Sequence, residues 1–427
     1  MIALFMFAVA LFLLLVGIPV AFAFGGVAII FAFLIPHLGF DVFSILPFRI
    51  YGIMSNTTLM AVPLFIAMGL ILEKSQMAEK LLVSMSALFR STRGGLAVSV
   101  VLVGALLAAS TGIVSASVVM MSVIALPLML NAGYDKGLAS GTIAASGTLG
   151  QIIPPSIILI VLGDVMSVSV GDLFKGAVLP GLVLVGLYIT YILIRSFLNP
   201  SIAPVAQNLK SISLKEIIFA IVPPLLLMFT VLGSIFAGIA SPTESAAFGV
   251  IGGLILSGFN KSISFEMIKY ASLETVKLSG MIFMILIGAT AFSLVFNELG
   301  GSDIILEFFS EDIGDVWVFI ILSMLSIFIL GFFIDFLEIS FIIVPILVPI
   351  MAAFGIDPIW FAVLIALNLQ ASFLTPPFGL ALFFLKGAAG DKVKTIEIYK
   401  GVIPFILLQL LGLGLVILFP DLVFAFL

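Results

Sequence analysis

The sequence predicts an all-α polytopic membrane protein with an inverted structural repeat, two re-entrant helical hairpins and two discontinuous helices. Composition is the first observation behind this prediction. Of 427 residues, 63% are hydrophobic and 9% are charged, whereas about 25% charged residues is usual in a soluble domain. A membrane-spanning helix needs about 20 residues, so there is room for about a dozen crossings. The apolar runs are continuous, which favours helices over the alternating strands of a membrane barrel.

The second observation is that the basic residues are clustered. Cytoplasmic loops carry an excess of lysine and arginine, so every group except the isolated Arg49 and Lys175 is assigned to the cytoplasmic side. The grouped residues are Lys74, Lys80, Arg90, Arg93, Lys136, Arg195, Lys210, Lys215, Lys261, Lys269, Lys277, Lys386, Lys392, Lys394 and Lys400. The segment 298–315 has no basic residue and is assigned to the outer side. Its acids are Glu298, Asp303, Glu307, Glu311, Asp312 and Asp315.

These assignments place the elements of the first half in order, starting from an N-terminus on the outer side. The expected crossings are 2–16, 19–36, 50–72, 137–163 and 176–194. The segment 74–93 is expected to be a cytoplasmic loop. Residues 94–130 lie between Arg93 and Lys136, both cytoplasmic. They are therefore expected to re-enter the membrane as a hairpin.

The second half follows the same logic from the opposite side. The expected crossings are 216–238, 243–259, 278–297, 358–385 and 402–420. Residues 316–353 lie between Asp315 and Asp357, both on the outer side, and are expected to form the second re-entrant hairpin. The C-terminus is then also on the outer side.

The third observation is an internal match between residues 1–212 and 213–427, which we interpret as two repeats. An offset of 222 positions superimposes residues that fix backbone shape. The matched residues are Pro127 with Pro349, Gly133 with Gly355, Asp135 with Asp357, and Pro154-Pro155 with Pro376-Pro377. Because the two hairpins enter from opposite faces, the repeat is inverted. Inverted repeats with interrupted helices are typical of secondary transporters, whose substrate and ion sites lie at the interruptions.

The expected interruptions are 145–156 within 137–163 and 368–379 within 358–385, and the expected hairpin tips are 109–117 and 331–340. Unwound backbone at membrane depth is tolerated where it is buried or lines a cavity. Its free carbonyls, with nearby hydroxyl and amide oxygens, suit a hard cation, and helix N-termini attract an anion. Serine, threonine and glycine are also common packing residues in membrane helices, but their occurrence in symmetry-related pairs favours a transport site.

Three acids in or beside the predicted spans have different expected roles. Asp335 and Glu338 lie in the second hairpin, where acids are costly and functional by default. If that hairpin is shallow, both lie near the outer interface instead. Glu244, behind Pro242-Thr243, is expected to cap the N-terminus of its helix.

The residue inventory argues against an enzyme. The chain has no cysteine and a single histidine, His37, which removes thiolate nucleophiles and leaves no base for a triad within a membrane. No metal site other than sodium is expected, and no nucleic-acid partner. A purely structural subunit is disfavoured by the helix breakers and the intramembrane acids.

Four motifs give the chain a resemblance to a known family over essentially its whole length. They are Val16-Gly-Ile-Pro-Val-Ala-Phe-Ala23, Ala61-Val-Pro-Leu-Phe-Ile-Ala-Met-Gly69, Gly147 to Pro155, and Ser241-Pro-Thr-Glu-Ser-Ala-Ala247. The chain resembles the large membrane subunit of tripartite ATP-independent periplasmic (TRAP) transporters. The family in turn resembles the elevator-type carriers of the ion-transporter superfamily.

The resemblance implies a sodium-driven importer of a small organic anion in the bacterial inner membrane. The implied partners are a small four-helix membrane subunit and a periplasmic substrate-binding protein. Family members carry C4-dicarboxylates, sialic acids, other sugar acids and keto acids, and overall likeness leans toward sialic acid. A self-sufficient sodium/dicarboxylate symporter of the same superfamily is the alternative.

Carried over by position, the resemblance also implies two sodium sites. The first consists of Ser110, Thr111, Gly112 and Ser115 with Gly147, Thr148 and Gln151. The second consists of Gly331 and Asp335 with Asn368, Ser372 and Thr375. Ser115 and Asp335 are expected to face the substrate. The second tip lacks the hydroxyls of the first, so backbone carbonyls are expected to dominate there.

Overall fold

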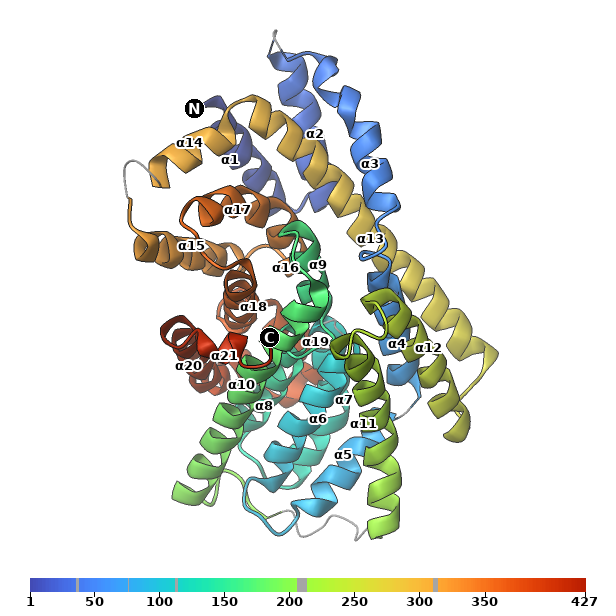
Figure 1. Ribbon diagram of the computed structural model, residues 1–427. Helices are drawn as coiled ribbons and strands as arrows, with labels where there is room; N and C mark the ends of the chain where they lie inside the picture. The colour runs from blue at the N-terminus through green and yellow to red at the C-terminus, as the bar shows by residue number, and fades with distance from the viewer. Residues whose placement is uncertain (36–37, 76, 112–113, 206–212, 310–313) are drawn as a thin grey trace.

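The structure is a computed structural model that describes residues 1–35, 38–75, 77–111, 114–205, 213–309 and 314–427. Over these residues the chain folds into helices joined by short turns, and no β-strand occurs among them (Figure 1). The predicted all-α fold is confirmed.

The first half contains ten α-helices and two short 3-10 turns. Their bounds are α1 Ile2–Leu15, α2 Val20–Leu34, η1 Phe40–Ile45, α3 Leu46–Met54, α4 Ala61–Lys74, α5 Met77–Leu88, α6 Gly95–Thr111, α7 Val114–Asn131, α8 Lys136–Thr148, η2 Leu149–Gln151, α9 Ile157–Val165 and α10 Val170–Leu198. The pair α6 and α7 forms the first predicted hairpin. The segment 137–163 is interrupted after η2 and resumes at α9, as predicted.

The second half repeats this order. Its elements are α11 Leu214–Phe236, α12 Pro242–Phe259, α13 Phe265–Glu298, α14 Gly301–Glu307, α15 Val316–Leu330, α16 Phe336–Glu338, η4 Ile339–Ile343, α17 Val344–Ala353, α18 Pro358–Leu374, α19 Leu380–Ala389, η5 Gly390–Lys392, α20 Thr395–Leu418 and α21 Asp421–Phe424. α15 to α17 form the second hairpin. α18 and α19 form the second discontinuous helix, with the break where the sequence predicts it.

Local geometry is repeated at matched positions. The Asp135 side chain caps α8 by accepting from the backbone N–H of Leu138, and Asp357 caps α18 by accepting from Trp360, both at 2.9 Å. Gly133 and Gly355 both have positive φ, +81° and +67°. The Pro154-Pro155 and Pro376-Pro377 peptide bonds are both cis. The repeat boundary at 212/213 stays a prediction, since residues 206–212 lie outside the described part.

The helices form two groups, which we call the frame and the core. The frame consists of α1–α5 and α11–α14, in which α2 packs along α13 and α4 along α12. The core consists of α6–α10 and α15–α21, in which α8 packs against α7 and α20. Figure 1 shows the blue and yellow frame helices running down one side of the core.

Among the described residues, six helices are long and apolar enough to cross a membrane, or seven if α4 and α5 are one bent span. The six are α7, α10, most of α11, α13, the stretch Phe336–Ala353 and α20. Exposed phenylalanines lie on their outer faces, for example Phe197 on α10 and Phe229 on α11. A multi-pass membrane protein is the arrangement that solvates such a surface.

Three expected elements differ from the structure. The crossing expected at 50–72 is divided into α3 and α4 by the turn 55–60, where Asn56 accepts backbone N–H bonds from Thr58 and Leu59. The loop expected at 74–93 contains α5, which buries Leu81 and Leu82. The crossing expected at 278–297 is the second part of α13, which is 34 residues long.

Candidate functional site

The first hairpin lies against the break in the first discontinuous helix. α7 and α8 pack so closely at Gly147 that a Cβ there would lie 3.1 Å from the Val118 Cα. Ser115 is half-buried and lies three residues before Val118, near the hairpin tip. Ser110 and Thr111 are the last residues of α6, and Gly112 lies outside the described residues.

Thr148 and Gln151 are fully buried at the break after α8. The Thr148 hydroxyl donates to the Ala145 carbonyl at 2.9 Å and accepts from the side-chain amides of Gln370 and Gln409 at 3.4 and 3.3 Å. The amide oxygen and nitrogen of Gln151 have no hydrogen-bond partner among the described residues. Buried polar groups are normally satisfied, so Gln151 is available to a ligand, whereas the Thr148 hydroxyl would bind one by exchanging its bond to Gln370 or Gln409.

The second hairpin lies against the second discontinuous helix in the same way. A Cβ at Gly331 would collide with the Ser372 Oγ, so the start of the tip touches α18. The Asn368 side-chain amide donates to the Met324 carbonyl of α15 at 2.6 Å. Ser372 and Thr375 donate their hydroxyl hydrogens to the carbonyls of Leu369 and Ala371, both at 2.8 Å. Their oxygens keep lone pairs that can accept a cation.

Asp335 and Glu338 form a reciprocal cap at the start of α16. The Phe336 N–H donates to the Asp335 carboxylate at 2.7 Å, and the Asp335 N–H donates to Glu338 at 2.6 Å. The π-helical turn η4 follows immediately, and such turns are frequent at functional sites. Both acids therefore stabilise the backbone conformation of the second tip. A contact between Asp335 and the substrate stays a prediction.

A buried polar cluster lies between the two breaks, and the sequence reasoning missed most of it. Thr148, Tyr188, Gln370 and Gln409 come from four elements and are at most 1% exposed. Gln370 could have been found, since it lies 222 positions after Thr148. No comparable signal exists for Tyr188 or Gln409.

Glu244 has the role expected from the sequence. Its carboxylate accepts from the backbone N–H and the hydroxyl of Ser241, both at 2.8 Å, and the Ser241 hydroxyl accepts from the Glu244 N–H. This reciprocal arrangement caps α12. The neighbouring Thr243 hydroxyl donates to the Thr57 carbonyl at 2.5 Å, which ties the start of α12 to the turn between α3 and α4.

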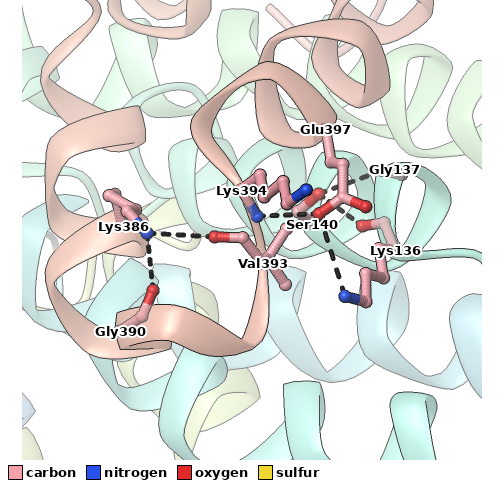
Figure 2. A network of polar contacts seen from close by, with 8 residues as sticks. All are labelled: Lys136, Gly137, Ser140, Lys386, Gly390, Val393, Lys394 and Glu397. Carbon is pink, nitrogen blue, oxygen red and sulfur yellow. Dashed lines mark hydrogen bonds and ion pairs between the residues drawn. The ribbon is translucent and has the colours of Figure 1, made fainter.

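Several of the basic residues assigned to the cytoplasmic side come together at one end of the core (Figure 2). Lys136 lies 3.9 Å from Glu397 at the starts of α8 and α20, and Glu397 also accepts from the Lys394 N–H at 2.7 Å. Lys386 donates to the carbonyls of Gly390 and Val393. Lys136 and Lys386, which are 250 residues apart in the sequence, thus lie at one end of the core, as the predicted topology requires.

Comparison with known proteins agrees with this architecture. The family model described as the DctM component of the tripartite ATP-independent periplasmic transporter matches residues 7–422. The C4-dicarboxylate TRAP transporter large permease protein DctM of Rhodobacter capsulatus is 29% identical over 99% of this chain and 98% of its own length. The sialic acid TRAP transporter large permease protein SiaM of Vibrio cholerae is 28% identical over 96% of this chain and 94% of its own.

A solved structure extends the comparison to the fold. The YdaH transporter of Alcanivorax borkumensis superimposes with a TM-score of 0.61, covering 90% of this chain and 89% of that one. The two sequences are 15% identical, so the likeness concerns the fold.

Proposed function

Because this chain belongs to the DctM component family of tripartite ATP-independent periplasmic transporters, we propose that it is the large membrane subunit of a sodium-coupled importer of a small organic anion. The observation that carries the proposal is the pairing of two hairpins with two broken helices across a buried polar centre. The proposed transport cycle is of the elevator type, in which the core moves relative to the frame.

The proposed cofactor is Na⁺. Site one would use the tip residues Ser110, Thr111, Gly112 and Ser115 with Gly147, Thr148 and Gln151. Site two would use Gly331 and Asp335 with Asn368, Ser372 and Thr375. The support is chemical: the described side chains among them offer hydroxyl and amide oxygens and, at Asp335, a carboxylate, and Na⁺ is a hard cation that binds oxygen ligands. Helix ends at the breaks add backbone carbonyls.

The proposed substrate is anionic and is held by half-helix N-termini and the co-bound sodium ions. No lysine or arginine lies in either hairpin tip or helix break. Such a site has little with which to capture a dilute anion, which favours delivery by a periplasmic binding protein. A small four-helix membrane subunit completes the proposed complex. The relatives named for C4-dicarboxylate and sialic acid transport define the substrate classes to try first.

The proposed location is the bacterial inner membrane, with both termini periplasmic. The alternative is a self-sufficient sodium/dicarboxylate symporter. The two differ in their need for a binding protein, so the decisive test is sodium-gradient-driven uptake into proteoliposomes that contain this chain and its small partner. We expect uptake of labelled succinate or N-acetylneuraminate with the binding protein and none without it. Equal uptake without that protein would leave the symporter standing.

A further inference from the structure

The turn between α3 and α4 makes a direct side-chain contact across the boundary between frame and core. The Asn56 side-chain amide donates to the Asp164 carboxylate at 2.5 Å, over a sequence separation of 108. Asn56 belongs to the frame, and Asp164 lies in the last turn of α9 in the core. The hydrogen bond between Ser234 and Ser245, by contrast, joins two helices of the frame.

The position of Asn56 is fixed by its own turn. Its amide oxygen accepts from the N–H groups of Thr58 at 2.9 Å and Leu59 at 3.3 Å, so the amide nitrogen is the atom that faces Asp164. The next residue, Thr57, is held by the Thr243 hydroxyl. The Ser241-Pro-Thr-Glu motif therefore anchors the turn that presents Asn56 to the core.

An acid at position 164 does not stabilise its own helix, α9. A carboxylate in the last turn of a helix faces the negative end of the helix dipole, which is unfavourable. Its bond to Asn56 offsets this cost, because a hydrogen bond to a charged group is stronger than one between neutral groups. A polar cavity of about 400 Å³, lined in part by Thr58, Asp164 and Ser169, lies beside the bond. Water in that cavity can solvate the carboxylate when the bond opens.

We propose that Asn56 and Asp164 form a latch that holds the core against the frame in the position seen here, and that the latch must open in every transport cycle. The position 222 residues after Asp164 is Lys386, which bonds to carbonyls of its own core segment at the other end of the molecule. The latch therefore belongs to one face and stabilises one of the two positions of the core. The inference rests on the proposed elevator-type function.

The first test uses the absence of native cysteine. In the double variant Asn56→Cys, Asp164→Cys, a short, reducible bis-methanethiosulfonate reagent bridges the two new cysteines. The variant is studied in proteoliposomes that also contain the two partner subunits. We expect bridging to abolish sodium-driven uptake of succinate or N-acetylneuraminate, and dithiothreitol to restore it. The matched control is Ser234→Cys with Ser245→Cys, whose hydroxyls lie 2.9 Å apart within the frame and whose bridging should leave uptake unchanged. Full uptake by the bridged latch variant would overturn the proposal.

The second test needs no substrate. Spin labels at Phe197 on α10 and Phe259 on α12, which are 79% and 82% exposed, report the distance between core and frame. Asn56→Ala should raise about tenfold the population in which the core has moved away from the latched position, relative to the population in that position. A tenfold change is the scale of one charge-assisted hydrogen bond. Thr243→Val should act in the same direction, and Thr243→Ser should restore the original ratio. An unchanged distance distribution in Asn56→Ala would contradict the latch, whether or not a substrate has been found. A shifted distribution without any sodium-driven uptake would contradict the proposed function and not the latch.

Discussion

Gln370 donates a side-chain hydrogen bond to Thr148 at 3.4 Å, and the two residues are separated by 222 positions, the offset that relates the two repeats. A residue that contacts its own repeat mate lies on the pseudo-two-fold axis. Thr148 is the last residue of α8 in the first discontinuous helix, and Gln370 lies between Asn368 and Ser372 in α18 of the second. This hydrogen bond joins α8, which contributes to the first proposed sodium site, to α18, which contributes to the second.

That contact predicts the effect of Thr148→Val. The substitution removes the hydroxyl that receives the amides of Gln370 and Gln409, and both would be left buried without a partner. Since an unsatisfied buried donor costs about 1–3 kcal/mol, we expect a lower melting temperature in detergent and a higher sodium concentration for half-maximal uptake. Thr148→Ser keeps the hydroxyl and should stay close to the original in both measurements. Unchanged sodium dependence in a folded Thr148→Val variant would remove Thr148 from the site.

A second prediction concerns Gly331, where the second hairpin touches α18. An added Cβ would meet the Ser372 Oγ and would lie 3.2 Å from the Ile327 carbonyl oxygen. Gly331→Ala must therefore displace the tip or Ser372, and overpacking of this kind costs about 1–3 kcal/mol. We expect weaker sodium binding in isothermal titration together with a loss of thermal stability. Gly280→Ala is the control, because nothing lies within 4 Å of a Cβ on that exposed face of α13. If both variants bind sodium equally well, the tip is not part of the second site.

Helix breakers and charges made much of this architecture predictable, because their effects are local. Pro154-Pro155 and Pro376-Pro377 stand beside glycines in mid-span, and the structure has breaks at both. The division between α3 and α4 was missed because residues 50–72 carry no charge. The polar run 55–58 marks the turn, which depends on the side chain of Asn56. Contacts such as Asn56–Asp164 and Thr148–Gln409 join positions with no sequence relation, so only the folded chain reveals them.

The predicted inversion of the repeat can be tested by labelling at the two capping aspartates. Asp135 and Asp357 are exposed and occupy matched positions before α8 and α18. With no native cysteine in the background, Asp135→Cys should react with a membrane-impermeant maleimide only from the cytoplasmic side and Asp357→Cys only from the periplasmic side. Each cap contributes about 1 kcal/mol, so both variants should fold. Reaction of both from one side would end the inverted-repeat interpretation.

The last prediction concerns the acidic segment at the start of the second hairpin. Asp303 and Glu307 of α14 and the cap residue Asp315 are exposed, while Glu311 and Asp312 lie outside the described residues. If this face receives the binding protein, the partner's docking surface is basic, and its association is slowed by salt, because exposed charges are screened within about 8 Å at physiological ionic strength. Replacing Asp303 and Glu307 together by lysine should slow association at least tenfold at low salt and flatten its salt dependence. Glu266→Lys, at the start of α13 that the sequence assigns to the cytoplasmic side, makes the same kind of charge change on the opposite face and should leave association unchanged. Surface plasmon resonance with the complex in nanodiscs measures the association rate of the binding protein with each variant across a salt series. Association of the double variant at the original rate would make the acidic segment an ordinary solvated turn and move the docking surface elsewhere on the periplasmic face.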